Sequence, residues 1–241
     1  MSMATVTIFR RELGAYLRSP VGWIVAALTL LLQGLLFQVF AARNTLAGDM
    51  LSNFFMWSSI VVVIAAVILS IRLISDERQS GALLLLNTSP VREVEIIVGK
   101  FLAALTFLGL ILVLSLYIPL LIKAEGKITL TQIAVSYLGL FLLGGAALAI
   151  GLFGSCVARH PLIAAVLGAA ITGILAVLYQ LSRYLDAPMN TVLGELDIWW
   201  IHFQGSFMRG IFDLKDVVYY LAMIYFFLLL SVKTMEAKRW Q

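Results

Sequence analysis

The chain alternates long apolar runs with short polar segments, and the length of these runs is its main structural signal. A helix that crosses a membrane needs roughly 20 consecutive apolar residues. Six runs approach or exceed this length, at residues 21–42, 54–74, 98–122, 132–157, 161–181 and 217–233. Away from their ends, they hold no Asp, Glu, Lys, Arg or His. We therefore predict an all-α membrane protein in which six transmembrane helices form a single domain, residues 1–241.

The composition supports this prediction. Of the 241 residues, 62% are hydrophobic and only 12% are charged, whereas a soluble domain carries about 25% charged residues. The single Cys156 excludes a disulfide framework within one chain and a cysteine-based metal cluster. The net charge of +4 comes from basic residues that mostly flank the apolar runs, so we expect no nucleic-acid partner.

The distribution of Lys and Arg predicts the orientation, because cytoplasmic loops carry an excess of these residues. With six spans, both termini share one side of the membrane with the loops at 75–97 and 158–160. That side holds eleven basic residues: Arg10, Arg11, Arg18, Arg72, Arg78, Arg92, Lys100, Arg159, Lys233, Lys238 and Arg239. The other side holds six: Arg43, Lys123, Lys127, Arg183, Arg209 and Lys215. Both termini are therefore expected in the cytoplasm.

Two further segments are neither spans nor plain loops. In residues 1–20, apolar side chains recur at helical spacing and the charged residues lie mostly off that stripe; its members are Val6, Phe9, Leu13, Tyr16 and Leu17. This pattern predicts an amphipathic interfacial helix on the cytoplasmic leaflet, in contact with membrane lipid; a short cytoplasmic cap is the alternative. Residues 182–216 are external and rich in aromatics, which suit the headgroup region. We expect short re-entrant or interfacial helices there, or a simple aromatic belt.

The missing charges exclude several function classes. Ion- and proton-coupled carriers use ionisable groups at depth, although broken helices can bind Na⁺ through backbone carbonyls alone. An intramembrane hydrolase is excluded as well, because the serines within the spans have no His or paired carboxylate that could act as a base. His160 and His202 lie in loops without a ligand cluster around them, so we interpret them as polar interface side chains. We expect no catalytic group, metal or cofactor in this chain.

No phosphate-binding loop is present either, because Gly99-Lys100 and Gly126-Lys127 lack the upstream Gly and the following Ser or Thr. Any energy for transport must then come from a partner, and a cytoplasmic partner needs a contact surface. The stretch SDERQSGALLLLNTSPVREVEIIVGK, residues 75–100, is the candidate. Its pattern predicts a short helix over 82–86, a turn at 87–90 and a new helix with Pro90 at its first position. The leucines at 83–86 need a cover, which a partner, the headgroups or the protein's own N-terminal helix could supply.

The same stretch resembles the first cytoplasmic loop of ABC-2 type transporter permeases. The matching residues are Glu77, Arg78, Gly81, Ser89, Pro90, Val91, Gly99, Lys100 and Phe101. The C-terminal region is similar to the end of short permeases of the gliding-motility (Gld-type) branch. That likeness rests on Arg209, Gly210, Asp213, Val217, Tyr219, Lys238, Arg239 and Trp240. The resemblance covers nearly the whole chain and implies the fold of an ABC-2 (type V exporter-like) transmembrane domain. It also implies a location in a bacterial cytoplasmic (inner) membrane.

The resemblance also implies a mechanism. Two copies, or this chain and a paralogue, pair around a central path, and each binds a separate ABC ATPase subunit that carries the ATP and Mg. The contacts to that subunit are Glu77, Arg78, Gly81, Leu83, Leu85, Leu86, Pro90, Arg92 and Glu95, with a smaller second contact at Arg159 and His160. Candidates for an external gate are Trp199, Trp200, Phe203 and Phe207. The chain departs from the family at Leu84, where an acid is frequent, and at His160-Pro161, where an amide pair is more usual.

The sequence is compatible with three functions. The leading one is the permease subunit of an ABC exporter. The second is an ABC-type subunit that transmits mechanical work to an extracytoplasmic accessory protein without moving a substrate. The third is an ATP-independent channel or membrane anchor, which needs no ATPase and tolerates polar residues at 83–86.

Overall fold

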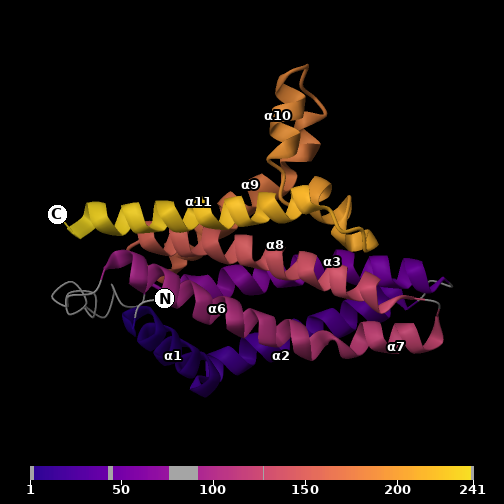
Figure 1. Cartoon of the computed structure of the whole chain (residues 1–241), viewed down its shortest axis with the longest axis horizontal. Helices are drawn as coiled ribbons and strands as arrows, with labels where there is room; N and C mark the ends of the chain where they lie inside the picture. The colour runs from indigo at the N-terminus through magenta and orange to yellow at the C-terminus, as the bar shows by residue number, and fades with distance from the viewer. Residues whose placement is uncertain (1–2, 43–45, 76–91, 127, 240–241) are drawn as a thin grey trace.

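The computed structural model describes residues 3–42, 46–75, 92–126 and 128–239 (Figure 1). Their regular structure is helical. In chain order the elements are α1 (Met3–Arg18), α2 (Pro20–Leu36), the π-helix η1 (Phe37–Ala41), α3 (Ala47–Ile71), α6 (Glu93–Ser115), α7 (Tyr117–Glu125), α8 (Leu130–Val157), α9 (Pro161–Ser182), α10 (Met189–Glu195), the π-helix η2 (Trp200–Gln204), the 3₁₀ helix η3 (Phe207–Arg209) and α11 (Leu214–Arg239).

Six of these helical stretches are long and apolar enough to cross a membrane, and they confirm the six predicted spans. They are Pro20–Ala41, Ala47–Ile71, Glu93–Ala124, Leu130–Val157, Pro161–Ser182 and Leu214–Lys238. The protein is thus a multi-pass membrane protein. The main deviation is the second span, which begins seven residues before the predicted residue 54, because polar Asp49 and Asn53 continue the helix beyond the apolar run.

Helix α8 is the centre of the bundle and packs against α3, α9 and α11. Glycines make this packing close. A Cβ placed on Gly151 would lie 2.8 Å from the Cβ of Ser70 in α3, and one on Gly168 in α9 would lie 3.1 Å from the Cα of Gly151. Helices in lipid associate through such small residues, because lipid tails are as apolar as the side chains.

Helix α1 lies at one end of the bundle, across the start of α6 and beside the start of α2 (Figure 1). Ser19 caps α2, its Oγ accepting from the Val21 N–H at 3.2 Å, and Pro20 occupies the first turn, where its missing N–H costs nothing. The Tyr16 ring stacks on Phe107 of α6. Its hydroxyl donates to the carbonyl of Leu69 in α3 at 3.0 Å. Tyr16 therefore connects α1 to two spans.

At the opposite end of the bundle, residues 183–213 form short helices. Figure 1 shows α10 standing off the bundle beside the C-terminal part of α9. In contrast, η3 packs onto α8, where Gly139 leaves room for the Phe207 ring. Gly210 has a φ of 73° and ends η3 in a left-handed conformation, which glycine adopts without a steric penalty.

The close contacts of α8 give a first test. Replacing Gly151 with Ala puts a methyl group against Ser70, and we expect a loss of about 1–3 kcal/mol of stability from overpacking. Gly173→Ala in α9 is the matched control, because nothing lies within 4 Å of its added methyl group. The measurement is the melting temperature of both purified variants in detergent. A Gly151→Ala protein that melts with the wild type would contradict the close packing of α3 on α8.

Candidate functional site

The described flanks of the predicted contact surface for an ATPase lie at the end of the bundle that carries α1 and the C-terminal part of α11. Most of its residues lie outside the described part of the chain: Glu77, Arg78, Gly81, Leu83, Leu85, Leu86 and Pro90. Their role therefore stays a prediction. The described structure does show how both flanks of this segment, at Ser75 and Arg92, are held.

The N-terminal flank is fixed to α8 by Ser155. Its Oγ accepts from the backbone N–H groups of Ile74 (3.2 Å) and Ser75 (3.0 Å) and donates to the carbonyl of Ile71 (2.9 Å). Ile74, Ser75 and Ser155 are fully buried. One hydroxyl thus satisfies three of the backbone groups that the end of α3 leaves unpaired. It attaches the start of the segment to the central helix.

The C-terminal flank is the N-cap of α6. The Arg92 backbone N–H donates to Glu95 Oε2 at 3.1 Å, as in a capping box. Arg92 is exposed and Glu95 is partly buried. The two predicted contact residues in this flank therefore lie together at the first turn of α6, where carboxylates also favour the positive end of the helix dipole.

Two turns further along α6, Gly99 and Lys100 hold α1. A Cβ on Gly99 would lie 2.9 Å from Ile8 Cγ2, so the glycine lets α1 approach closely. The Lys100 side chain is only 1% exposed, and its Nζ donates to Glu12 Oε1 at 3.2 Å. A buried ammonium needs such a partner. The Gly-Lys pair that carries part of the family resemblance is, in this structure, the docking point of α1.

Glu12 faces α6, and its side chain is only 16% exposed. Burial raises the pKa of the Glu12 carboxyl, but Lys100 and Arg11 outweigh this effect, so the pKa is lower than its usual value. The carboxylate accepts from Arg11 as well, at 2.7 Å. Glu12 is therefore ionised near neutral pH and offsets the charge of Lys100.

The second predicted contact, Arg159 and His160, lies in the exposed turn between α8 and α9. His160 is the N-cap position of α9, and Pro161 is its first residue. Lys238 of α11 supports this turn, because its Nζ donates to the carbonyls of Cys156 (3.0 Å) and Val157 (2.8 Å) at the end of α8. A cation on the last carbonyls of a helix also complements the helix dipole.

The four gate candidates at the other end of the bundle divide into two pairs. Trp199 and Trp200 are partly buried, and Trp199 Nε1 donates to Ser59 Oγ of α3 at 2.8 Å. Phe203 and Phe207 are fully buried in the protein core, so they pack the segment onto the bundle and do not face the headgroup region. The gate itself stays a prediction.

His202 belongs to a buried polar network that the sequence did not reveal. Its Nε2–H donates to the Glu195 carbonyl (3.1 Å), and its Nδ1 contacts Asp216 Oδ1 of α11 (2.6 Å). The Ser206 hydroxyl contacts the other oxygen of Asp216. His202 is thus an internal support and not an interface side chain.

Asp197 supports the same segment. This buried carboxylate accepts from the backbone N–H groups of Tyr179 (3.2 Å) and Trp199 (2.7 Å). Burial raises the pKa of Asp197, and the backbone N–H groups partly offset that rise. Within the described residues, no group of three or more His, Cys, Asp or Glu side chains could hold a metal ion.

The ion pair between Glu12 and Lys100 can be tested by a double-mutant cycle. Glu12→Gln removes the carboxylate that accepts from the buried Lys100 ammonium, and we expect a loss of about 2–3 kcal/mol. Combining it with Lys100→Met should cost less than the sum of the two single changes, because both changes remove the same contact. Melting temperature and trypsin cleavage after Arg10 and Arg11 report on the docking of α1. Glu236→Gln, in the exposed pair with Lys233, is the control and should change little; equal effects of both carboxylates would contradict a docking role.

A family profile described as ABC-2 family transporter protein matches residues 6–194, well over half of the chain. The match includes most of α1, the two flanks of the 76–91 segment and the turn at Arg159 and His160. No curated protein matches the chain. The protein therefore belongs to the ABC-2 family of transporter membrane proteins.

Proposed function

We propose that this protein is the permease subunit of an ABC exporter, which works as a dimer and is driven by a separate cytoplasmic ATPase. The family match supports a permease in general. The observation that carries the coupling proposal is the attachment of both flanks of the 76–91 segment to different helices. Ser75 is held by α8, whereas Arg92 begins α6, which holds α1.

This attachment gives an ATPase a means to act on the spans. A force on the segment reaches α8 through Ser155 and α1 through Lys100 and Glu12. The contacts are short and buried, so little of the displacement is lost in side-chain rearrangement. Arg159, exposed on the neighbouring turn, offers a second contact at the end of the same α8.

A groove between α3 and α9 is our candidate for one wall of the transport path. Toward the Trp199 end it forms a hollow of about 310 Å³, and nearer Ile71 a second hollow of about 340 Å³; Val63, Ile64, Gly173 and Ala176 line both. The lining is almost wholly apolar. Such a wall suits a substrate with a large apolar part better than a hydrated ion.

One observation also favours the alternative function, transmission of force to an extracytoplasmic protein. The segment after α10 is locked to α11 by His202 and Asp216 and to α3 by Trp199. A rigid outer segment could pass movement of the spans to an extracytoplasmic protein. The likeness to the gliding-motility branch stays a prediction that agrees with either function.

The arm formed by α10 and the C-terminal end of α9 supports pairing with a second permease subunit. It projects from the bundle (Figure 1), and its apolar side chains, such as Leu181 and Val192, are exposed. If two copies pair through this arm, a cysteine at Val192 should form a cross-linked dimer under mild oxidation. Leu221→Cys, exposed on α11, is the control; the native Cys156 is buried. Equal cross-linking at both positions, or none, would argue against this interface.

The coupling proposal is tested by co-purification. We expect a stoichiometric ATPase subunit, encoded beside this protein, to come down with the wild type and to hydrolyse ATP. Leu83→Asp combined with Leu86→Asp should remove it and lower the hydrolysis of the eluate by at least tenfold, the factor that corresponds to a loss of about 1.4 kcal/mol. Leu46→Asp, exposed at the opposite end of α3, is the matched control. A folded protein that purifies alone would instead favour an ATP-independent channel or anchor.

A further inference from the structure

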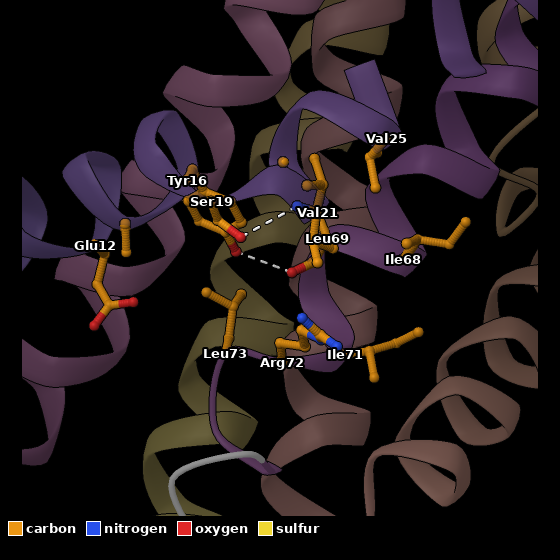
Figure 2. Close-up of a pocket in the computed structure, with 12 residues that line it drawn as sticks. Glu12, Tyr16, Ser19, Val21, Val25, Ile68, Leu69, Ile71, Arg72 and Leu73 are labelled. Carbon is orange, nitrogen blue, oxygen red and sulfur yellow. Dashed lines mark hydrogen bonds between the residues drawn. The ribbon is translucent and has the colours of Figure 1, made fainter. Parts of the chain in front are cut away.

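A pocket of about 340 Å³ lies where α1, α2 and α3 meet (Figure 2). Its wall comes from the second half of α1, the first turns of α2 and the C-terminal end of α3. Gly22 permits this arrangement, because any Cβ there would collide with the Tyr16 carbonyl oxygen. The pocket is separate from the α3–α9 groove, although Ile68 and Ile71 line both.

The wall of this pocket has two chemically different parts. One part is apolar and consists of Val21, Val25, Ile68, Leu69, Ile71 and Leu73. The other is polar and includes Ser19 and Arg72. The Ser19 Oγ accepts from the Val21 N–H and still has its own hydrogen to donate. The Arg72 guanidinium is a permanent cation with five N–H donors.

A carboxylate also lines the pocket, but its charge is compensated. Glu12 accepts from Lys100 and Arg11. Figure 2 shows Glu12 at the far left of the view, with Tyr16 and Leu73 between it and Arg72. The donors that line the other part of the pocket, the Arg72 guanidinium and the Ser19 hydroxyl, suit the oxygen atoms of an anion.

The position of the pocket relative to the membrane identifies the kind of anion. It lies where the spans beginning at Pro20 and ending at Ile71 reach their ends, which is the level of the lipid headgroups. Trp23, 51% exposed, donates from Nε1 to the Leu17 carbonyl at 2.8 Å at the same level, as tryptophans of an interfacial belt do. Val21 and Ile68 are exposed on the apolar side, so the pocket opens toward the bilayer.

We propose that this pocket binds an anionic phospholipid of the leaflet on the α1 side. Its phosphate contacts Arg72 and Ser19, and one acyl chain lies along Val25 and Ile68. Basic sites between transmembrane helices at a membrane surface bind anionic headgroups in this way. The proposal goes beyond the transport function, because it concerns the bilayer and holds with or without an ATPase.

Such a lipid would lie between the C-terminal half of α1 and the last turn of α3. Leu73 lines the pocket and comes two residues before Ser75, where the segment held by Ser155 begins. Bound lipid would therefore fix the angle between α1 and α3 beside the proposed coupling surface. It adds a contact to the one that Tyr16 makes with Leu69.

Native mass spectrometry of the purified full-length protein tests the proposal. The detergent-solubilised protein is titrated with phosphatidylglycerol or with phosphatidylcholine of the same acyl chains. We expect one phosphatidylglycerol to bind at least fivefold more tightly, since one arginine near a charged headgroup contributes roughly this factor. Arg72→Gln should remove that preference, and Arg72→Lys should retain most of it.

Arg159→Gln is the matched control, because Arg159 is an exposed arginine at the same end of the bundle but outside the pocket. Ile68→Trp fills the apolar part and should weaken the binding of both lipids, and unchanged melting temperatures show that the variants are folded. Equal affinity for the two lipids, or equal effects of Arg72→Gln and Arg159→Gln, would overturn the proposal. So would displacement of phosphatidylglycerol by millimolar inorganic phosphate, which would show that a free anion occupies the site.

Discussion

The close approach of helix backbones around α8 is the constraint on which the rest of this structure depends. In a bilayer, the lipid tails solvate apolar side chains as well as other side chains do, so helices gain by packing closely and not by escaping the solvent. Gly151, Gly154 and Gly168 bring α3 and α9 against α8, and Gly139 admits the Phe207 ring of η3. Because α8 contacts elements from both halves of the chain, it is the fixed reference for the other spans.

Polar contacts then attach the two ends of the bundle to this reference. Ser155 and Lys238 bind backbone groups that the ends of α3 and α8 leave without a helical partner, and at the other end Asp197 and Asp216 organise the segment after α10. Polar side chains within the spans are fewer than at the span ends, and most of their hydroxyl groups donate to a carbonyl of the same helix. The side chains of Gln33 and Ser58 are buried and have no hydrogen-bond partner among the described residues. The chain thus places its strong polar interactions where the spans end.

The spans could be predicted from the sequence because a long apolar run is a local signal. Their ends were less certain, as the extra turns of α3 before residue 54 show. Glu12 could not be recognised as a packing residue, since its partner Lys100 lies 88 residues away and a charged residue near an apolar stripe usually faces solvent. His202 presents the same difficulty with Asp216. The Gly99-Lys100 pair is visible in the sequence, but only the position of α1 explains why a glycine and a lysine stand there.

The contact between Lys238 and the end of α8 can form only late in the synthesis of the protein. A polytopic chain enters the membrane in the order of its synthesis, and Lys238 emerges after all six spans. Until then the carbonyls of Cys156 and Val157 lack this cation, and the turn at Arg159 lacks the support of α11. The second of the two proposed ATPase contacts is therefore completed last, after all six spans have been made.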